Sequence, residues 1–264
     1  MEPLQLDIVF KGLGQSLFSK NLIFVETVDS TNNMAKDLAA KGAQEGTVVV
    51  AEEQTAGRGR LQRKWLSPKH ANLLFSVLLR PSTIVPDQIF TLTMILALAS
   101  IDAVEDVSGI HIMIKWPNDL YVNQKKLGGI LTEFSVRKNL VQHVVLGLGL
   151  NVNWEPADSS LLYPSTSILT ETGGAVSREQ ILIRILKKFE RYYYQILAGK
   201  LDNFYERWNR RSMLFGKRIT IQGPGESRDG IARGIDKNGA LVITNDKGKE
   251  ERVMCGDISV KLHS

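Results

Sequence analysis

A long apolar segment, residues 87–107, constrains the fold of this chain more than any other feature. Its apolar residues recur at helical spacing, and Gly109 follows as a helix stop signal. A helix with so little polar surface has to be buried inside a larger structure. Hydrophobic residues make up 43% of the 264 residues, enough to build a sizeable core around that helix. We therefore expect a main domain organised about a buried helix.

Other periodic segments predict the strands and helices that surround it. The expected strands cover residues 22–27, 47–51, 73–79, 110–116, 129–136 and 140–150, with a hairpin turn at 137–139. One helix is expected after Ser30, one from Ser177 to about Gly199, and a shorter one over 202–211. Ser177 and Gln180 have the spacing of a capping box. The combination predicts a mixed α+β domain.

The pattern changes from about Phe215 onward. Short β runs are separated there by turns, at 218–222, 231–235, 240–244 and 258–262. Asn238-Gly239 is a strong tight-turn signal, and Lys247-Gly248 is a weaker one. About fifty residues of this kind predict a small β-barrel appended to the main domain. The expected domains are therefore residues 1–214 and 215–264.

Charge and cysteine content narrow the possible partners. Lys and Arg number 33 and Asp and Glu 28, so the net charge is +5, which suits an anionic small molecule or an acidic protein. Cys255 is the only cysteine, so an internal disulfide and a cysteine metal cluster are excluded, and the four histidines show no metal-ligand spacing. Residues 1–20 lack the order of a signal peptide, and the longest apolar run, 94–101, is far short of the ~20 residues that span a bilayer. We expect a soluble cytoplasmic protein with no membrane partner.

The first candidate site is a glycine-arginine segment, Gly57-Arg58-Gly59-Arg60, which follows a predicted strand and precedes Arg63. Glycines let the backbone approach a ligand closely, and guanidinium groups match phosphate or carboxylate oxygens in two-point contacts. The segment has neither the Gly-Lys-Ser/Thr of a P-loop nor a dinucleotide-binding fingerprint. Its composition alone fits a solvated basic turn as well as an anion-binding loop.

The second candidate site combines a Pro-Asn-Asp turn, which ends in Asp119, with a basic and glycine-rich segment at 125–130. A hairpin with a lysine-rich bend would explain this pattern. However, Gly128 and Gly129 stand directly before an apolar strand, where glycines often mark the close approach of a ligand. Lys126 beside them would supply a point charge to that ligand.

Two further segments have structural explanations as well as functional ones. Ser30, Thr31 and Asn32 are residue types favoured as helix N-caps, but a helix N-terminus is also a donor-rich binding site. Alternating glycines at 147–149 would produce a bend, or would leave room for a flat ring whose edge is read by Asn151. The pattern by itself leaves both pairs of alternatives open.

Taken in order, these four segments resemble the catalytic domain of biotin protein ligases. The resemblance runs from about residue 21 to 153 and continues more weakly over 165–168. The segments 234–236, 239–241 and 256–259 are similar to the small SH3-like domain of that family. The resemblance implies a mixed-sheet domain of the class II synthetase and biotin–lipoate ligase type, followed by an SH3-like β-barrel.

The resemblance also implies a two-step reaction. Biotin and ATP with Mg²⁺ would give biotinyl-5′-AMP and pyrophosphate, and a lysine of a biotin carboxyl carrier protein domain would then attack the mixed anhydride. The implied biotin-binding residues are Ser30, Thr31, Asn32, Gln54, Arg58, Gly59, Arg60, Lys126 and Gly128. The implied nucleotide-binding residues are Arg58, Arg63, Lys126 and Asn151.

The implied catalytic residues are Lys126, Arg60 and Asp119. Lys126 would lie between the biotin carboxylate and the α-phosphate, Arg60 would belong to a loop that orders over the adenylate, and Asp119 would lie near the metal or the incoming lysine. Joining a carboxylate to ATP brings two anions together, so positioned cations and Mg²⁺ offset the repulsion. No protein nucleophile is needed. Asp119 would either accept the proton of the acceptor lysine or orient that lysine.

Two departures from the family pattern stand out. Gln62 replaces a glycine that often continues the arginine-glycine loop. Only about twenty residues precede the first core strand, which are too few for the helix-turn-helix of members that repress transcription. We expect a monofunctional ligase that does not bind specific DNA. A homodimer formed through an edge strand is a further expectation.

Two other functions compete with this interpretation. A lipoate–protein ligase is related in fold and chemistry, but the arginine-glycine loop and the Lys126–Gly129 segment match the biotin family better. A non-catalytic nucleic-acid binder would explain a basic chain that ends in a small β-barrel. The modest net charge and the lack of an aromatic-basic stripe argue against it.

Overall fold

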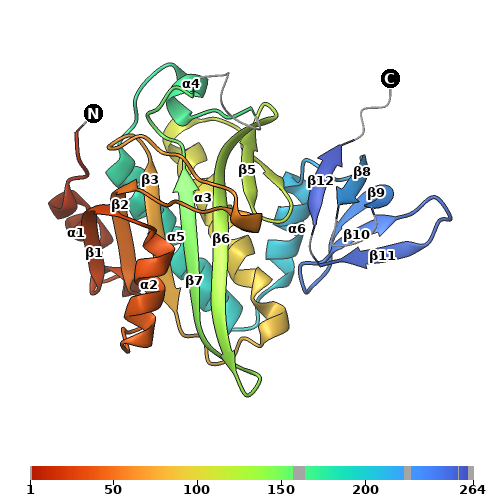
Figure 1. Cartoon of the computed structure of the whole chain (residues 1–264), viewed down its shortest axis with the longest axis horizontal. Helices are drawn as coiled ribbons and strands as arrows, with labels where there is room; N and C mark the ends of the chain where they lie inside the picture. The colour runs from red at the N-terminus through yellow and green to blue at the C-terminus, as the bar shows by residue number, and fades with distance from the viewer. Residues whose placement is uncertain (1, 157–163, 223–226, 255, 261–264) are drawn as a thin grey trace.

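A computed structural model describes the chain apart from residues 1, 157–163, 223–226, 255 and 261–264, which are grey in Figure 1. The main sheet has seven strands in the order β1-β2-β3-β7-β6-β5-β4. Its strands are β1 (Leu22–Val28), β2 (Val48–Gln54), β3 (Leu73–Leu79), β4 (Met113–Lys115), β5 (Asp119–Val122), β6 (Lys125–Arg137) and β7 (Leu140–Leu150). The β1–β2 pair is parallel and the other pairs are antiparallel, so the predicted mixed sheet is confirmed.

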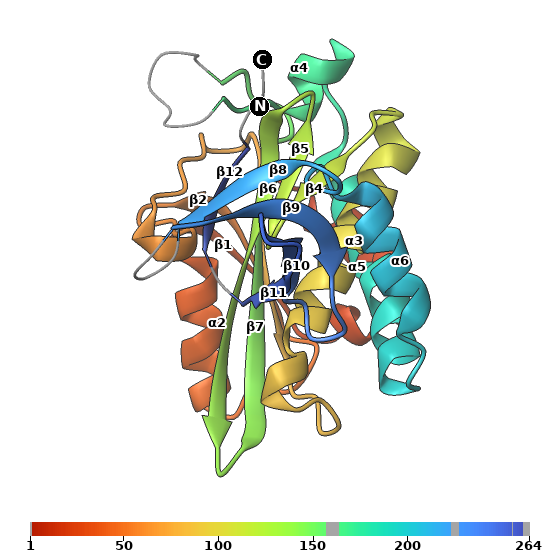
Figure 2. The same ribbon diagram turned by 90° about the vertical axis from the view of Figure 1, so that its right-hand side faces the viewer.

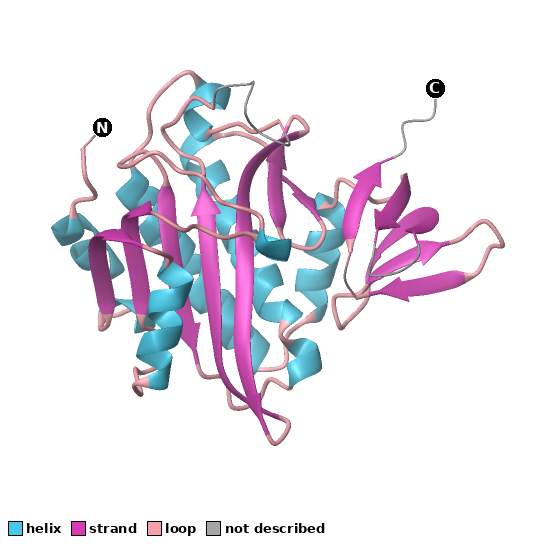
Figure 3. Cartoon of the chain, viewed as in Figure 1, coloured by secondary structure: helices cyan, strands magenta, loops and turns pink. Residues whose placement is uncertain are grey.

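The helices cover both faces of this sheet. They are α1 (Leu6–Leu13), α2 (Thr31–Ala40), α3 (Phe90–Ser108), α4 (Ile168–Thr172), α5 (Arg178–Leu197) and α6 (Asp202–Arg211), with 3₁₀ turns η1 (Leu17–Ser19), η2 (Arg60–Gln62) and η3 (Pro86–Gln88). Helix α2 lies on one face, whereas α3, α5 and α6 lie on the other (Figure 2). Figure 3 shows the same layers, with α3, α5 and α6 behind the sheet and α2 in front of it.

The predicted buried helix is α3, and it begins later than expected because η3 precedes it. Most of its side chains are fully buried between the sheet and α5. It is long and apolar enough to cross a membrane, and no other helix in the described part of the chain is, but 78% of that apolar window is buried inside the protein. Its apolarity is thus explained by the core.

Several strand boundaries differ from the sequence-based prediction. The strand expected at 110–116 is reduced to β4, and the one expected at 129–136 extends back to Lys125 as β6. Gly128 permits this extension, because a Cβ there would lie 2.9 Å from the carbonyl oxygen of Gly149 on β7. The hairpin turn at 137–139 is confirmed, with Lys138 and Asn139 in the left-handed region. Helices α1 and α4 were not predicted.

The C-terminal residues form a second, antiparallel sheet in the order β11-β10-β9-β8-β12. Its strands are β8 (Arg218–Gln222), β9 (Ser227–Ile235), β10 (Leu241–Thr244), β11 (Glu250–Val253) and β12 (Asp257–Val260). The predicted small β domain is confirmed, and its sheet is open: β11 pairs with β10 and β12 with β8, and no pairing between β11 and β12 closes the sheet among the described residues. The predicted Asn238-Gly239 turn is present, with Gly239 at φ +79°.

Candidate functional site

A cavity of about 430 Å³ lies over the sheet at the N-terminal end of α2. Its volume is in the range of ~300–1,000 Å³ typical of small-molecule sites. The predicted site residues that line it are Ser30, Thr31, Asn32, Gln54, Arg58, Gly59, Arg60, Arg63, Asp119, Lys126 and Asn151. Gly128 is not among the lining residues, although its neighbour Gly129 is. The fold therefore brings all four predicted segments to one place.

Residues 57–65 form a folded arm, not a simple solvated turn. The backbone N–H of Gly59 donates to the carbonyl of Arg63 at 2.7 Å, and that of Trp65 donates to the carbonyl of Gly57 at 2.9 Å. A Cβ at Gly57 would lie 2.6 Å from the Trp65 carbonyl oxygen, so this pairing requires glycine there. Figure 1 shows the arm crossing in front of β7 and β6, with η2 at its tip.

The N-terminus of α2 is held from outside the helix. Ser30 occupies the N-cap position as predicted, but its side chain makes no capping hydrogen bond. Instead the side-chain Oε1 of Gln54 accepts from the Thr31 N–H at 2.8 Å and from the Thr31 hydroxyl at 3.0 Å. Gln54, at the end of β2, thus satisfies a helix-terminal donor that a capping side chain would otherwise serve. This contact joins two of the predicted binding residues.

Asn32 and Ser76 continue this polar network into the protein. The Ser76 hydroxyl lies 2.6 Å from the side-chain oxygen of Asn32 and 2.8 Å from the Thr31 hydroxyl. Ser76 is fully buried on β3, and the prediction missed it. A lone polar residue inside the apolar run 73–79 was the available signal.

The alternating glycines on β7 accommodate side chains of this chain. A Cβ at Gly147 would lie 2.1 Å from the side-chain oxygen of Asn32, and one at Gly149 would lie 2.5 Å from the Trp65 indole. The paired register of β7 with β3 and β6 continues through both positions, which excludes a bend as the explanation for these glycines. The flat ring at Gly149 is that of Trp65.

Lys126 and Asp119 form a salt bridge in the cavity, with Nζ and Oδ2 2.8 Å apart. A Cβ at Gly129 would lie 3.1 Å from Asp119 Oδ1 and 3.4 Å from Lys126 Nζ, so this glycine leaves room for the pair. The ammonium also lies 5.7 Å from the ring centroid of Trp65, within reach of a cation–π contact. The β5–β6 segment and the arm therefore meet at Lys126.

Three buried polar atoms in the cavity have no hydrogen-bond partner within the described residues: Trp65 Nε1, Asp119 Oδ1 and Ser165 Oγ. Buried polar groups are nearly always hydrogen-bonded, because an unpaired one loses its hydration without compensation. The three residues line the same cavity and offer one donor, one acceptor and one hydroxyl. They fit a polar ligand with both donors and acceptors.

Positive charge is concentrated at the same place. Burial lowers the pKa of Lys115, and the neighbouring cations Lys126 and Arg63 lower it further, although Asp119 acts in the opposite direction. A cluster whose cations disfavour one another is stabilised by an anion placed among them. Lys115 was not assigned a site role, although it stands two positions before Pro117 of the Pro-Asn-Asp turn.

Asn151 lines the cavity, but its side-chain amide is engaged in the protein. Its Nδ2 donates to the carbonyl of Thr166 at 3.0 Å, and its Oδ1 accepts from Asn72 Nδ2 at 3.4 Å. Asn72 also accepts from the backbone N–H of Val152 at 2.9 Å. These bonds fix the orientation of the Asn151 amide. A contact between Asn151 and adenine remains a prediction.

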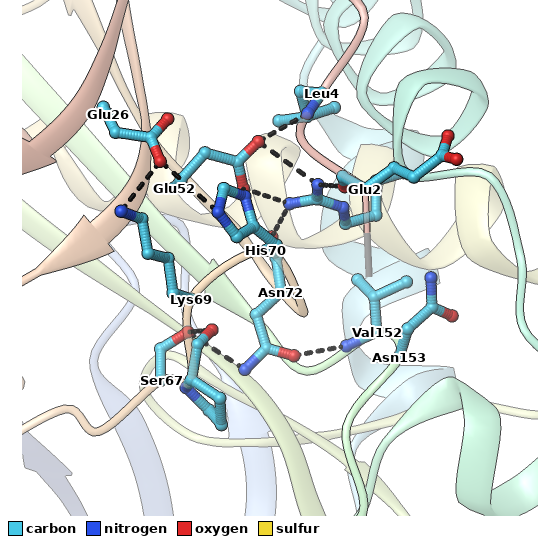
Figure 4. Close-up of polar contacts among 12 residues, drawn as sticks. Glu2, Leu4, Glu26, Glu52, Ser67, Lys69, His70, Asn72, Val152 and Asn153 are labelled. Atoms are coloured by element: carbon cyan, nitrogen blue, oxygen red, sulfur yellow. Dashed lines mark hydrogen bonds and ion pairs between the residues drawn. The ribbon is translucent and has the colours of Figure 1, made fainter.

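A buried ion pair holds the segments on both sides of the arm (Figure 4). Arg178 NH1 lies 2.6 Å from Glu52 Oε2, and these side chains are 4% and 0% exposed. Arg178 also donates to the Asn72 carbonyl at 3.1 Å, and the Leu4 N–H donates to Glu52 Oε1 at 2.5 Å. Glu52 precedes the arm on β2 and Asn72 follows it before β3. The pair thus ties the chain together beneath the arm.

Family comparisons agree with this arrangement. Residues 24–151 match the biotin/lipoate A/B protein ligase family, and residues 214–261 match the biotin protein ligase C-terminal domain. The chain is 34% identical over 239 residues to the bifunctional ligase/repressor BirA of Bacillus subtilis, covering 90% of this chain and 73% of that protein. It is 34% identical over 229 residues to the biotin–[acetyl-CoA-carboxylase] ligase of Paracoccus denitrificans, covering 84% and 93%.

A solved structure supports the same assignment of the fold. The biotin protein ligase from Aquifex aeolicus in complex with biotin and ATP superposes with a TM-score of 0.78 at 30% identity. The match covers 92% of this chain and 99% of that protein. The similarity therefore includes both sheets, not only the segments that line the cavity.

Proposed function

We propose that the cavity beside α2 is the active site of this chain, which belongs to the biotin/lipoate A/B protein ligase family. The chain is an ATP-dependent ligase that forms biotinyl-5′-AMP and transfers biotin to a protein lysine, and the proposal assigns both steps to this cavity. The observation that carries this proposal is a set of buried polar atoms at Trp65, Asp119 and Ser165 that have no hydrogen-bond partner in the described part of the chain. They stand among Lys115, Lys126 and the arginine arm, where an anionic and polar ligand fits.

Biotin would bind at the N-terminus of α2. Ser30, Thr31 and Gln54 lie together there and offer hydroxyl and amide groups to the ureido ring. Gly59 would contribute its backbone from the arm above. Asn32 would support the site from below, because its own polar atoms are engaged by Ser76 and β6. The apolar part of the ligand would lie along β7 at Leu148.

The cations would align the two anions of the first step. Lys126 would lie between the biotin carboxylate and the α-phosphate, where it would offset both charges. Arg58 and Arg60 would close the arm over the adenylate, and Arg63 would face the triphosphate. Such preorganised charges lower the cost of bringing two anions together and stabilise the charge that develops on the phosphate.

Asp119 would act in the second step. The acceptor lysine has to lose its proton before its amine can attack the acyl-adenylate. Asp119 Oδ1 is buried and has no hydrogen-bond partner among the residues that the structure describes, while Oδ2 is paired with Lys126. A lysine reaching Oδ1 would therefore meet a carboxylate already held in place, which would orient it or accept its proton.

Mg²⁺ is a further part of the proposal. No group of three or more His, Cys, Asp or Glu side chains suited to a metal occurs in the described residues. Mg²⁺ is commonly held by one or two carboxylates together with substrate phosphates, and Asp119 Oδ1 fits such a single protein ligand. When bound with ATP, the ion would neutralise phosphate charge.

We propose a biotin carboxyl carrier protein domain as the acceptor, since the similar protein of Paracoccus denitrificans is named for acetyl-CoA-carboxylase. We propose the cytoplasm as the compartment and no membrane or specific DNA as a partner. A homodimer paired at the edge strand β1, and a domain division after residue 214, belong to the same proposal.

Labelled biotin, ATP and a purified carrier domain test the function directly. We expect ATP-dependent incorporation into the carrier and biotin-dependent release of pyrophosphate. An excess of unlabelled biotin should abolish the signal, whereas an excess of lipoate should not. Incorporation that lipoate suppresses as strongly as biotin would contradict the assigned substrate. A sequence-specific electrophoretic mobility shift of DNA that survives physiological salt would contradict the proposed absence of specific DNA binding.

A further inference from the structure

Glu133 is an acidic residue on β6 that the proposed chemistry does not use. Its carboxylate accepts from Lys36 Nζ at 2.6 Å and from Asn32 Nδ2 at 2.8 Å, and it lies 3.6 Å from Arg58 NH2. The side chain is 25% exposed. Two of its partners come from α2 and one from the arm, so Glu133 joins three separate segments at the side of the cavity.

Arg58 has a second contact with the same region. Its NH2 group donates to the side-chain oxygen of Asn33 at 2.5 Å, and Asn33 in turn donates to Asp29 at 2.6 Å. One guanidinium nitrogen therefore lies between α2 and β6. The arm, which is otherwise held by its own hairpin pairing, is tied to two rigid elements through this one side chain.

Asn32 is held by Glu133 just as firmly. Its Nδ2 donates to Glu133 and to the Leu131 carbonyl, at 2.8 and 3.2 Å, and its oxygen lies 2.6 Å from the Ser76 hydroxyl. The residue is 3% exposed, and each polar group of its side chain has a partner. Glu133 therefore sets the amide orientation on which the Ser76–Thr31–Gln54 network depends.

Glu133 is well suited to remain charged in this position. Burial raises its pKa, but hydrogen bonds from Lys36 and Asn32 and the charges of Lys36 and Arg58 outweigh that effect, so the pKa lies below its usual value. A charged acceptor forms stronger hydrogen bonds than a neutral one. Neutral residues at this position would leave Lys36 and Arg58 without their shared partner.

We propose that Glu133 is a positioning residue that keeps the arginine arm closed over the acyl-adenylate, by orienting Asn32 and anchoring Arg58 from β6. The inference rests on the proposed function of the cavity. It makes retention of the intermediate depend on a residue outside the set that touches the ligand. Release of the adenylate before transfer would expose its reactive mixed anhydride to unrelated lysines.

The test is Glu133→Gln, which keeps the size of the side chain and removes its charge. We expect biotinyl-5′-AMP to dissociate about five-fold faster, in line with the loss of charge-assisted contacts at a partly exposed site. Labelling of bystander lysines should rise in parallel. Single-turnover formation of the adenylate at saturating biotin should change much less, because Lys126 and Arg60 are untouched.

Asn33→Ala is a second variant that loosens Arg58 from α2 without altering the buried network. It should also speed dissociation of the adenylate. If Glu133 and Asn33 both act through Arg58, the effect of combining Glu133→Gln with Asn33→Ala should be smaller than the sum of the two single effects. Lys36→Met, which removes the other cation of Glu133, should leave dissociation within about two-fold of the unmodified protein. Asn33→Ala keeps the test open if Glu133→Gln fails to fold.

The outcomes separate this inference from the proposed function. An unmodified protein that forms no adenylate from biotin and ATP would refute the function itself. An unmodified protein that forms and retains it, together with Glu133→Gln and Asn33→Ala proteins that retain it equally well, would refute only the positioning role. Faster dissociation in both variants, with unchanged thermal unfolding, would support that role.

Discussion

At the scale of single residues, polar contacts within the protein hold the charged and polar side chains of the cavity in position. Lys126 is paired with Asp119 at 2.8 Å, so each is held in place by the other. All the side-chain polar groups of Asn32, and Oε1 of Gln54, make contacts within the protein and thereby position Thr31 and Ser76. Residue types that a sequence pattern marks as ligand-binding thus include some that act by supporting their neighbours.

Lys126→Ala should slow adenylate formation by at least about a hundred-fold, since it removes the cation proposed to lie between the two anions. The measurement is biotin-dependent pyrophosphate release under single-turnover conditions. Lys125→Ala is the control, because Lys125 is exposed on the same strand and lies outside the cavity lining. Pyrophosphate release near the unmodified rate in Lys126→Ala would rule out the proposed role.

Gly149→Ala should displace the Trp65 indole, because the new Cβ would lie 2.5 Å from that ring. Since the indole belongs to the arm, we expect a higher KM for biotin and altered tryptophan fluorescence. Gly174→Ala is a matched control, since no atom lies within 4 Å of the Cβ built there. Equal biotin KM values in the two variants would show that the glycine does not serve Trp65.

At the scale of elements, the arm depends on the segments that flank it. Arg178 at the start of α5 is a cation at a helix N-terminus, which is an unfavourable position for its charge. Its bidentate pairing with Glu52, deep in the protein, compensates for that position. The pair also reaches Asn72, so α5, β2 and the segment before β3 are held in a common arrangement (Figure 4).

Arg178→Met should lower the free energy of unfolding by about 3–5 kcal/mol, because it removes the guanidinium that pairs with the buried Glu52 carboxylate. Urea unfolding measures the change. Adding Glu52→Gln to this variant should restore part of the loss. Arg210→Met is the control: its partner Glu206 is 72% exposed, and such surface pairs contribute only ~0–1 kcal/mol. Equal losses in the two single variants would contradict the buried-pair argument.

At the scale of the whole molecule, the C-terminal sheet contributes to the cavity. Gly256 and Ile258 line it, and the indole N–H of Trp116 donates to the Gly239 carbonyl at 2.9 Å. Trp116 is itself a lining residue three positions before Asp119. The turn at Gly239 therefore supports the β4–β5 segment, which carries Asp119.

Gly239→Ala should disturb this support, because its Cβ would lie 2.0 Å from the Phe90 ring and its φ is +79°. We expect lower stability and slower pyrophosphate release at saturating substrates. Gly248→Ala is matched in backbone strain, with φ +74°, but no atom lies within 4 Å of its Cβ. It should lose roughly 1 kcal/mol of stability and keep its activity. Equal activity losses in both would indicate strain alone.

Local patterns determined much of this protein. The apolar run in 87–107, the β runs and the turn residues predicted the buried helix, the mixed sheet and an appended β domain, because burial and turn geometry act over a few residues. Four short segments predicted most of the cavity lining. The family resemblance that these segments carry assigned Lys126, Asp119 and the arginine arm to one site, and all of them line the same cavity.

Tertiary structure decided what depends on contacts between distant segments. It assigned the space at Gly147 and Gly149 to Asn32 and Trp65, capped α2 with Gln54, and left the second sheet open. It also joined Glu133 to the arm through Arg58. A sequence shows which residues have room or charge to offer, but only the packed chain determines which partner uses them, since hydrogen bonds and close approaches require exact distances in space.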